Sequence, residues 1–525
     1  MPCPGSIARR GQGVQTRRDR PVANRMATVG VVPGRNTTRT QNGDAMTATG
    51  SRIIVLGAGI SGLAAGMLLR RDGHKVTILE RDPEPVPRSP RQAWERWTRD
   101  GVTQFRQPHF LQSRGRIVLT QELPDVLAAL ASNGGLRFDP LRQLMPPTIT
   151  DRTPRDGDER FKTVTARRAV LEQVLGRAAD AEPGLDIRRG VSVRELVVRP
   201  RHGIPHVTGV RTDSGEEWKA DLVVDAMGRR SQLPRWLEVA GARPVQEALD
   251  DAGFIYYTRY FRSRDGALPQ FKAPILTAIG TFSVLTIPCD DAMWSVTLAI
   301  SAGDQPLKRL RHPGPWTGLV AACPRHSHWL SGDPIGGVLP MSGLVDRHRR
   351  FNVGGRPVAT GIAAVGDACV CTNPTNGRGM ALGLMHIQRL RDVTRDHLDD
   401  PREFAEVWDA VTEAELTPWY RDNLEEDRLR LAEMEAIRCG LDPSAPKTPS
   451  AALRQALFAA VPYDADAFRA YLASRSCLTP AREALADPAF VEHLLRVACD
   501  RDCAPPAGPT RSQLLRLMND VPMAA

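Results

Sequence analysis

A glycine-rich turn at residues 57–62 is the feature that most limits how this chain can fold. Its sequence, G-A-G-I-S-G, joins an apolar stretch, Ile53–Leu56, to an apolar helical pattern that runs from Ser61 to Arg71. The first glycine permits a tight turn, the second lets the backbone approach a pyrophosphate, and the third lets strand and helix pack closely. The turn therefore predicts a βαβ unit whose helix N-terminus offers unpaired N–H groups to phosphates.

An acidic residue follows the turn where a dinucleotide site requires one. Asp72-Gly73 ends the helical pattern, residues 75–79 form a second strand pattern, and Glu80 comes directly after it. A carboxylate at the end of this strand accepts hydrogen bonds from the ribose hydroxyls of adenosine. It also disfavours a ribose 2′-phosphate, so FAD or NAD fits this pocket better than NADP.

A second glycine-rich segment lies far downstream of the first. Residues 364–368, A-V-G-D-A, end a buried strand pattern, and the loop 373–380, N-P-T-N-G-R-G-M, leads into an apolar helix expected from Arg378 to Arg395. A carboxylate at this strand end is placed to bind ribityl hydroxyls. The second helix N-terminus is placed to stabilise negative charge at a flavin N1–C2=O edge or a pyrophosphate.

These segments, over roughly residues 51–400, resemble the para-hydroxybenzoate hydroxylase-like family of FAD-dependent monooxygenases. The segment 101–104, G-V-T-Q, is similar to the family's segment in which a glutamine approaches the flavin, and Arg168 is similar to the helix arginine that meets the cofactor. The motifs and the resemblance together indicate these cofactor-binding residues: Gly57, Gly59, Ile60, Ser61, Gly62, Glu80, Arg81, Gln104, Arg168, Asp225, Gly366, Asp367, Gly377 and Gly379.

One motif departs from the family pattern. The family has Asp-Gly in its middle motif, whereas this chain has D-A-M-G-R-R-S at residues 225–231. The family associates that motif with both FAD and NAD(P)H binding, so the departure leaves NADH and NADPH both open as reductant. The same variant, the run Q-F-R-Q-P-H-F-L at 104–111 and the C-terminal extension resemble the flavin epoxidases of polyketide polyether pathways.

The predicted fold class is α/β, with a Rossmann-like FAD-binding domain of the glutathione-reductase-like type that is split in the sequence. Its two parts are residues 51–240 and 351–400, with a β-rich substrate domain at 241–350 and a helical region at 401–525. A chain of 525 residues is expected to form two or three packed units.

Several elements are predicted from hydrophobic periodicity. Helices are expected at 119–130 and 166–179, and strands at 191–198, 206–211 and 221–225 are expected to return to the same sheet. A block of strands follows at 254–261, 275–287 and 294–301, which is suited to covering a ligand. The run Leu424–Arg430 is expected to be a solvated helix face, with an interaction surface as the alternative.

The net charge of +10 is concentrated at the N-terminus. Residues 1–50 hold eight Arg and two Asp, so the remainder carries 62 basic and 58 acidic residues, which does not indicate a nucleic-acid partner. The first fifty residues are interpreted as a disordered tail or as a mis-annotated extension with synthesis starting at Met46, and a transit peptide is the third alternative.

Cysteine and hydropathy patterns point to a cytoplasmic chain. Nine scattered cysteines without a C-x-x-C motif predict free thiols, and the nearest approach to a metal cluster, Cys323 with His326 and His328, lacks a fourth ligand, so no metal is expected. The longest apolar run, Ile53–Leu69, contains the glycine turn and is therefore a strand, turn and helix rather than a transmembrane segment.

The resemblance implies a cycle in which NAD(P)H, a transient visitor, reduces FAD, O₂ adds at C4a, and the hydroperoxide hydroxylates or epoxidises a small organic substrate. A polyprenyl-reductase-like FAD-dependent reductase or dehydrogenase is the main alternative, and a flavin-binding protein without turnover is a third. A halogenase is disfavoured because its W-x-W-x-I-P segment is absent.

Two polar residues near the glutamine segment are candidate pocket groups. They are His109 and Arg106, and the alternative for His109 is a buried histidine whose partners are satisfied. Aromatic residues of the β-rich block are candidates for an apolar pocket wall or for ordinary core: Phe254, Tyr256, Tyr260, Phe282 and Trp294.

Overall fold

The glycine turn belongs to a parallel sheet of five strands. The computed structural model describes residues 50–442, 448–499 and 507–520. The strands of this sheet are β1 (Arg52–Leu56), β2 (Lys75–Glu80), β5 (Asp186–Arg189), β9 (Leu222–Asp225) and β19 (Ile362–Ala364), in the order β19-β9-β1-β2-β5. Leu56 of β1 pairs with Asp225 of β9, which pairs with Ala364 of β19. The strand ends that carry the motifs therefore meet at one edge of the sheet, where open α/β sheets bind ligands.

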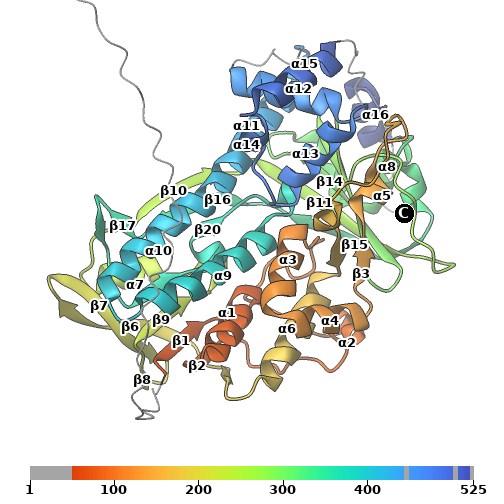
Figure 1. Ribbon diagram of the computed structural model, residues 1–525. Coiled ribbons are helices and arrows are strands. Elements are labelled where there is room, and N and C mark those ends of the chain that lie inside the picture. The colour runs from red at the N-terminus through yellow and green to blue at the C-terminus, as the bar shows by residue number, and fades with distance from the viewer. Residues whose placement is uncertain (1–49, 443–447, 500–506, 521–525) are drawn as a thin grey trace, which may run out of the picture. The chain divides into compact units, whose positions relative to one another are not determined.

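Both faces of this sheet are covered, which explains its apolar sequence. Ile53 and Val55 of β1 pack into one core with helices, whereas Ile54 and Leu56 pack into a second core on the opposite face. Helices α1, α6 and α9 lie side by side over the first face (Figure 1). The helices of this core are α1 (Ile60–Arg71), α3 (Ser113–Glu122), α4 (Pro124–Ser132), α6 (Arg168–Ala181), α9 (Gly379–His397) and α10 (Pro401–Glu415).

The expectation that three middle strands return to the parallel sheet is wrong for two of them. Only β9 joins it, while β6 (Val193–Arg201), β7 (Ile204–Thr212) and β8 (Glu217–Lys219) form a separate antiparallel sheet that packs on its second face. The turn at His202 and Gly203, both with positive φ, closes a local hairpin between β6 and β7, so these strands pair with each other.

The helix expected at 119–130 is two helices. The chain leaves helical geometry at Leu123, and α4 begins at Pro124. Proline has no N–H to donate and disfavours helical geometry at the preceding residue, but it suits the first helical position. The expected solvated face at Leu424–Arg430 is also wrong in part, because Asp427 is buried and hydrogen-bonded within the protein.

A second large sheet lies along the chain between the two motif regions. It has the order β12-β13-β14-β11-β15, and the stretch 275–287 is a hairpin that turns at Gly280, where φ is +48°. Its strands are β11 (Phe254–Arg262), β12 (Leu276–Ile279), β13 (Phe282–Pro288), β14 (Met293–Ser301) and β15 (Asp333–Met341). A small sheet, β10 (Gln246–Asp251), β16 (Val345–Arg350) and β20 (Val370–Cys371), precedes the second glycine-rich loop.

Alternate residues of the second sheet face different surroundings. Phe282, Val284 and Trp294 lie in a core with α8 (Pro313–Ala321) and α16 (Arg511–Asp520), whereas Leu285 and Ile287 of β13 point to the other side. This period of two is the geometry of a strand. One face of the sheet is therefore free to form a wall of a pocket.

Beyond residue 400, the regular elements that the structure describes are all α-helices. Five of these helices begin with a side-chain cap, from Asp400, Thr448, Asp464, Asp487 and Thr510. The helices that follow α10 are α11 (Thr417–Arg438), α12 (Pro449–Ala460), α13 (Ala465–Arg475), α14 (Ala481–Ala484), α15 (Pro488–Cys499) and α16 (Arg511–Asp520). Figure 1 shows α12 to α15 gathered together.

The remaining elements are short. They are α2 (Pro90–Glu95), α5 (Pro140–Leu144), α7 (Leu233–Val239), α8 (Pro313–Ala321), β3 (Leu136–Phe138), β4 (Thr163–Thr165), β17 (Asn352–Val353) and β18 (Arg356–Pro357). None of the helices in the described ranges has the length and apolar character needed to cross a bilayer.

Candidate functional site

The glycine turn has the geometry of a cradle for phosphates. Gly57 has φ +98°, which only glycine adopts without strain. A Cβ at Gly62 would lie 1.8 Å from the carbonyl oxygen of Gly57, so the third glycine permits close packing. A Cβ at Gly59 would meet nothing within 4 Å, and no side chain caps α1. The turn therefore leaves open space beside an uncapped helix N-terminus, which fits a pyrophosphate.

The two glycine-rich motifs are in direct contact. Gly366 has φ +54°, and a Cβ there would lie 2.8 Å from Oγ of Ser61 in the first motif. A Cβ at Gly383 of α9 would lie 3.0 Å from the same hydroxyl. The second motif is held by His386, whose Nδ1 accepts a hydrogen bond of 3.2 Å from the Gly366 amide. The sequence pattern around His386 does not indicate this role.

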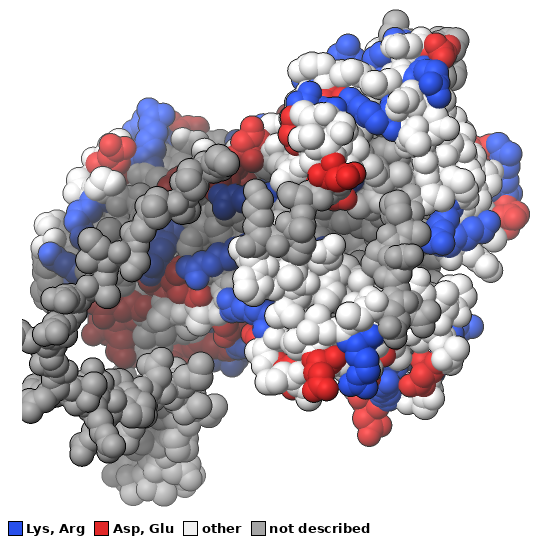
Figure 2. All heavy atoms as spheres, turned by 90° about the horizontal axis from the view of Figure 1, so that it is seen from above, with Lys and Arg blue, Asp and Glu red and all other residues white. Residues whose placement is uncertain are grey.

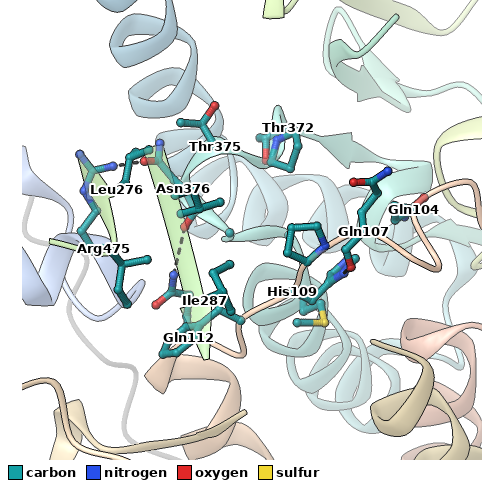
Figure 3. A pocket seen from close by; sticks show the side chains of 18 of the residues that line it. Gln104, Gln107, His109, Gln112, Leu276, Ile287, Thr372, Thr375, Asn376 and Arg475 are labelled. Atoms are coloured by element: carbon teal, nitrogen blue, oxygen red, sulfur yellow. Dashed lines mark hydrogen bonds between the residues drawn. The ribbon is translucent and has the colours of Figure 1, made fainter. Parts of the chain in front are cut away.

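A single large cavity, of about 2300 Å³, begins at these motifs. It runs from the glycine turn past the segment 101–112 to the free face of the second sheet and to helices α11 to α13. Figure 3 shows side chains that line it, with Gln104 and His109 on one side and Asn376 and Arg475 on the other. The predicted residues on its wall are Gly57, Gly59, Ile60, Ser61, Glu80, Arg81, Gln104, His109, Arg168, Asp367, Gly377 and Gly379.

Four predicted residues do not line this cavity. Gly62 and Gly366 act in the packing between motifs, as described above. Arg106 points elsewhere, because it donates to the carbonyl oxygens of Ala93 and Trp97 and lies over the ring of Trp94. The expectation that Arg106 is a pocket residue is therefore wrong. Its side chain holds its own loop in place.

Asp225, the fourth, is fully buried behind the cavity. It accepts hydrogen bonds from the amide of Met227, at 3.0 Å, and from the hydroxyl of Ser231. Burial raises its pKa to about 6. Gly228 adopts a positive φ in this turn, at +71°, whereas Ala226 does not, so an alanine fits at this position. Asp225 thus shapes the turn next to the cavity.

Glu80 is held in place by its neighbours. Its Oε2 accepts from the amide of Ala58 at 2.7 Å and from Nη2 of Arg99 at 2.9 Å, and its Oε1 accepts from the amide of Asp82 at 2.9 Å. Arg99 is buried and also pairs with Glu172. The carboxylate reaches the cavity with its orientation fixed on both oxygens, and Oε1 retains the capacity to accept from a ribose hydroxyl.

His109 and Arg168 form a hydrogen-bonded pair on the cavity wall. Nη1 of Arg168 lies 3.2 Å from Nε2 of His109, and Nδ1 of His109 lies 2.9 Å from the carbonyl oxygen of Gln107. Removal from water and the charge of Arg168 lower the pKa of His109 to about 3. His109 is therefore a neutral imidazole that donates from Nδ1 and accepts from Arg168. His109 therefore lines the cavity and has both ring nitrogens hydrogen-bonded.

The loop 372–379 is held by residues that the sequence analysis missed. Nε2 of Gln112 donates to the carbonyl oxygen of Asn376 at 3.0 Å, and a guanidinium nitrogen of Arg475 donates to the Asn376 side chain (Figure 3). Nδ2 of Asn376 donates to Glu426 at 2.9 Å. Although burial opposes it, the guanidinium groups of Arg475, Arg378 and Arg454 lower the pKa of Glu426 to about 2. Helices beyond residue 400 thus brace the loop.

The part of the cavity at the second sheet is mainly apolar. Leu276, Leu285 and Ile287 of the second sheet contribute to it, and aromatic rings from other segments complete it. Of the five aromatic residues considered in the β-rich block, Phe254 lines the cavity, while Tyr256, Tyr260, Phe282 and Trp294 are buried in cores.

The surface and the thiols add little to the site. On the described part of the face in Figure 2, basic and acidic side chains are interspersed. Among the described residues, no cluster of three or more His, Cys, Asp or Glu is arranged for a metal ion, and Cys323 donates to the carbonyl oxygen of Leu319 instead. The cysteines of the described ranges are free.

Comparison with known proteins identifies the cofactor. Residues 52–249 match the model of the FAD binding domain family. The chain is an FAD-dependent oxidoreductase. Its curated relatives include protein Rv3254 of Mycobacterium tuberculosis, 28% identical over 361 residues that cover 64% of this chain and 72% of that protein. The FAD-dependent monooxygenase fsr3 of Gibberella fujikuroi is 26% identical over 270 residues, which is 47% of each protein.

Solved structures confirm the mixed helix and sheet fold of FAD-binding enzymes. The Diels-Alderase PyrE3 of the pyrroindomycin pathway superposes with a TM-score of 0.55 at 16% identity, covering 82% of this oxidoreductase and 81% of that chain. PqsL, a probable FAD-dependent monooxygenase from Pseudomonas aeruginosa, superposes with a TM-score of 0.53 at 16% identity, covering 74% and 96%. The expected likeness to FAD-dependent monooxygenases is confirmed at this level.

Proposed function

We propose that this oxidoreductase is a monooxygenase that uses NAD(P)H and O₂ to hydroxylate or epoxidise a small organic substrate. The observation that carries the proposal is the continuity of the cavity, which joins the cofactor cradle at Gly59 to the apolar sheet face at Leu285. A cofactor in the cradle and an apolar molecule at the sheet face would share one continuous cavity.

The size of the cavity supports two occupants. A pocket for one small molecule is typically about 300–1,000 Å³. The cavity of about 2300 Å³ therefore exceeds what a single ligand requires. Its polar end fits an extended dinucleotide, and its apolar end fits a separate organic substrate.

The domain division follows from the same geometry. We assign the Rossmann-like FAD-binding domain, of the glutathione-reductase-like type, to residues 51–240 and 351–400, because β19 pairs with β9 and the two glycine motifs touch at Ser61. The β-rich substrate domain at 241–350 and the helical region at 401–525 supply the remaining walls.

Different residues of the chain are placed for different parts of FAD. The uncapped N-terminus of α1 and the guanidinium of Arg168 are placed for phosphate oxygens, Glu80 for a ribose and Asp367 for ribityl hydroxyls. Gly377 and Gly379 leave the backbone of the second loop exposed to the cavity. Bound FAD would supply the redox chemistry, in which a hydride from NAD(P)H provides the electrons, one oxygen atom of O₂ enters the substrate and the other leaves as water.

The apolar wall has a second task in this proposal. Side chains such as Leu276 and Ile287 exclude water from the space beside the cofactor. An oxygenating flavin enzyme needs a dry site, because water promotes loss of the activated oxygen as hydrogen peroxide. No side chain needs to act as an obligatory acid or base for the oxygen transfer itself.

The test is anaerobic reduction of the purified holoprotein by NADPH or NADH, followed by rapid mixing with O₂ in a stopped-flow spectrometer. A monooxygenase is expected to return to the oxidised spectrum in two resolved phases and to release hydrogen peroxide late. Reoxidation in one phase, with any aromatic or polyene compound present or absent, would favour the polyprenyl-reductase-like alternative.

A variant that cannot hold the cofactor provides the control. Gly59→Val places a branched side chain in the open space of the cradle. It is expected to lack flavin and to oxidise no NAD(P)H. Purification of the wild-type chain without flavin after FAD has been supplied would contradict the proposal.

A further inference from the structure

Helix α11 presents five charged side chains to the cavity, and one of them differs from the others. Glu425 and Glu426 pair with Arg454, and Arg430 pairs with Glu433 at 2.5 Å. The fifth is Asp427. Within the described ranges, no cationic group lies within ion-pair distance of Asp427. A carboxyl on a cavity wall without a counter-ion is an unusual group in a folded protein.

Asp427 is also deeply buried. Its residue surface is 4% exposed, and Oδ2 accepts a hydrogen bond of 2.9 Å from Nδ2 of Asn423. A second carboxyl, Asp346 of β16, lies near it and is 1% exposed, with Oδ1 bound to the amide of Asn373 and Oδ2 without a partner in the described structure. Two buried carboxyls in one low-dielectric region cannot both ionise cheaply.

The surroundings keep Asp427 in its neutral form. Burial, then the charges of Asp346 and Glu426, raise its pKa to about 8, while a hydrogen bond from Asn373 and the charge of Arg378 oppose the rise. Tyr256 of β11 faces the same region, and burial and Asp427 raise its pKa too. At neutral pH Asp427 is thus a carboxylic acid with an O–H to donate.

The wall around Asp427 offers few competing donors. Phe254, Ala299 and Met341 line the cavity nearby from the second sheet, and the hydroxyl of Ser283 is engaged by Arg430. A neutral donor beside an apolar surface recognises a ligand by its shape and by one acceptor atom. Sites of this kind discriminate strongly against analogues that lack the acceptor, because the donor is then left unpaired.

We propose that Asp427 recognises an oxygen acceptor, a carbonyl or ether oxygen, on an otherwise apolar polycyclic or chain-like substrate. The inference deepens the proposed function, on which it rests for the assumption that an organic substrate enters this cavity. It assigns the substrate class, an apolar molecule with an isolated oxygen function, and it assigns Asp427 a binding role.

The test compares two flat probes of one shape, 9-fluorenone, which has a ketone oxygen, and fluorene, which has none. Binding to the oxidised holoprotein is followed by the change in flavin absorbance or fluorescence. The wild-type chain is expected to prefer fluorenone by about fivefold, the contribution of one hydrogen bond. Asp427→Ala should lose the preference while it binds fluorene as before, and Asp427→Asn should retain it because the amide N–H₂ donates.

The chain offers a matched control in Glu433. This carboxyl lies on the same helix and the same cavity but is engaged by Arg430, so Glu433→Gln is expected to keep the fluorenone preference. Equal preference in the wild type and Asp427→Ala overturns the proposal. Failure of both probes to bind the wild type overturns it as well. Flavin content of each variant is measured first, so that a folding defect is recognised.

The dependence on pH supplies a second readout. The wild-type preference for fluorenone should disappear as Asp427 ionises, because a carboxylate has no proton to donate. Asp427→Asn should show no such loss over the same range. A wild-type preference that persists above the pKa overturns the proposal. Because these probes bind the oxidised flavoprotein without turnover, the outcome is separate from whether the enzyme proves to be a monooxygenase or a reductase.

Discussion

Arg168 donates a hydrogen bond from Nη1 to Nε2 of His109, at 3.2 Å, and a second from Nε to Oε1 of Glu172, at 2.6 Å. Two acceptors on different segments, His109 and Glu172, therefore hold the guanidinium in place. Its remaining N–H groups stay at the cavity wall, where a phosphate would meet them. The hydrogen bond from Arg168 to His109 forms only while the imidazole is neutral, since a protonated His109 has no lone pair to accept with.

The first prediction concerns this imidazole. His109→Asn removes the acceptor from Arg168, and we expect it to weaken FAD binding about tenfold, because a hydrogen bond to a charged group contributes about 1.5–3 kcal/mol. The dissociation constant of FAD, measured by flavin fluorescence, checks this. His202→Asn is the matched control, because His202 lies on an exposed turn with positive φ that asparagine tolerates.

The same histidine gives a pH dependence of known sign. Its pKa is about 3 in the folded protein against 6.5 as the ordinary value, so the unfolded chain binds the extra proton first. Its contribution to stability is present above pH 6.5 and is lost as the pH falls through about 3. His109→Asn should therefore show a shallower loss of unfolding free energy in this acid range. A slope equal to that of the wild type would contradict the assignment of a neutral imidazole.

The second prediction separates the roles of the second and third glycines of the turn, Gly59 and Gly62. Gly59→Ala adds a methyl group in open space, so the unfolding free energy of the apoprotein should change by less than about 1 kcal/mol. The methyl group lies where a pyrophosphate would approach, so FAD affinity should fall. Gly62→Ala places a Cβ 1.8 Å from a carbonyl oxygen and should destabilise the apoprotein itself. Thermal unfolding with and without FAD distinguishes the two effects.

The elements around the first motif could be predicted because their signals are local. The strand, turn and helix at 52–71 carry their periodicity within a few residues, and the structure places β1 and α1 there. The Gly366-Asp367 segment was found for the same reason. The placement of β6 and β7 could not be predicted, because the sheet that a strand joins depends on partners far away in the sequence.

The supports of the second loop were invisible to sequence reasoning for a related reason. His386 sits in the middle of an apolar helix, and its contact with Gly366 becomes apparent only when α9 lies on the sheet. The run 424–430 has the composition of a solvated face, yet Glu426 and Asp427 face a buried loop. Charge in a helix pattern does not reveal whether the countercharges come from solvent or from another helix.

The third prediction follows from the pKa of Asp427. A folded pKa of about 8 against an ordinary value of 3.8 means that the folded protein holds a proton that the unfolded chain releases. Stability should therefore decline as pH rises from about 4 to about 8, by about 1.4 kcal/mol for each pH unit in that range.

Asp427→Asn isolates this contribution. The variant has no proton to retain, so its advantage in unfolding free energy over the wild type should grow across that range and then stay constant. Urea titrations at a series of pH values measure the difference. A constant difference from pH 4 to 8 would show that Asp427 is ionised in the folded protein.

The fourth prediction concerns the brace of the second loop. Glu426 accepts from Asn376 and neutralises Arg378, Arg454 and Arg475, of which Arg378 is 1% exposed. Glu426→Gln leaves buried guanidinium charge without its counter-ion, so the unfolding free energy should fall by about 3 kcal/mol. FAD affinity should fall with it, because the loop that contains Gly377 loses its support.

The control for this brace is Glu435→Gln on the same helix, where the carboxyl is 51% exposed and pairs with Arg438 on the surface. It should change stability by less than about 1 kcal/mol, as exposed ion pairs do.

The pKa of Glu426 is about 2 in the folded protein against 4.5 ordinarily, so its stabilisation is complete above pH 4.5 and disappears as the pH falls through 2. The difference between the wild type and Glu426→Gln should shrink over that window, and a difference that stays constant would mean that hydrogen bonding by the neutral side chain, rather than charge, holds the loop.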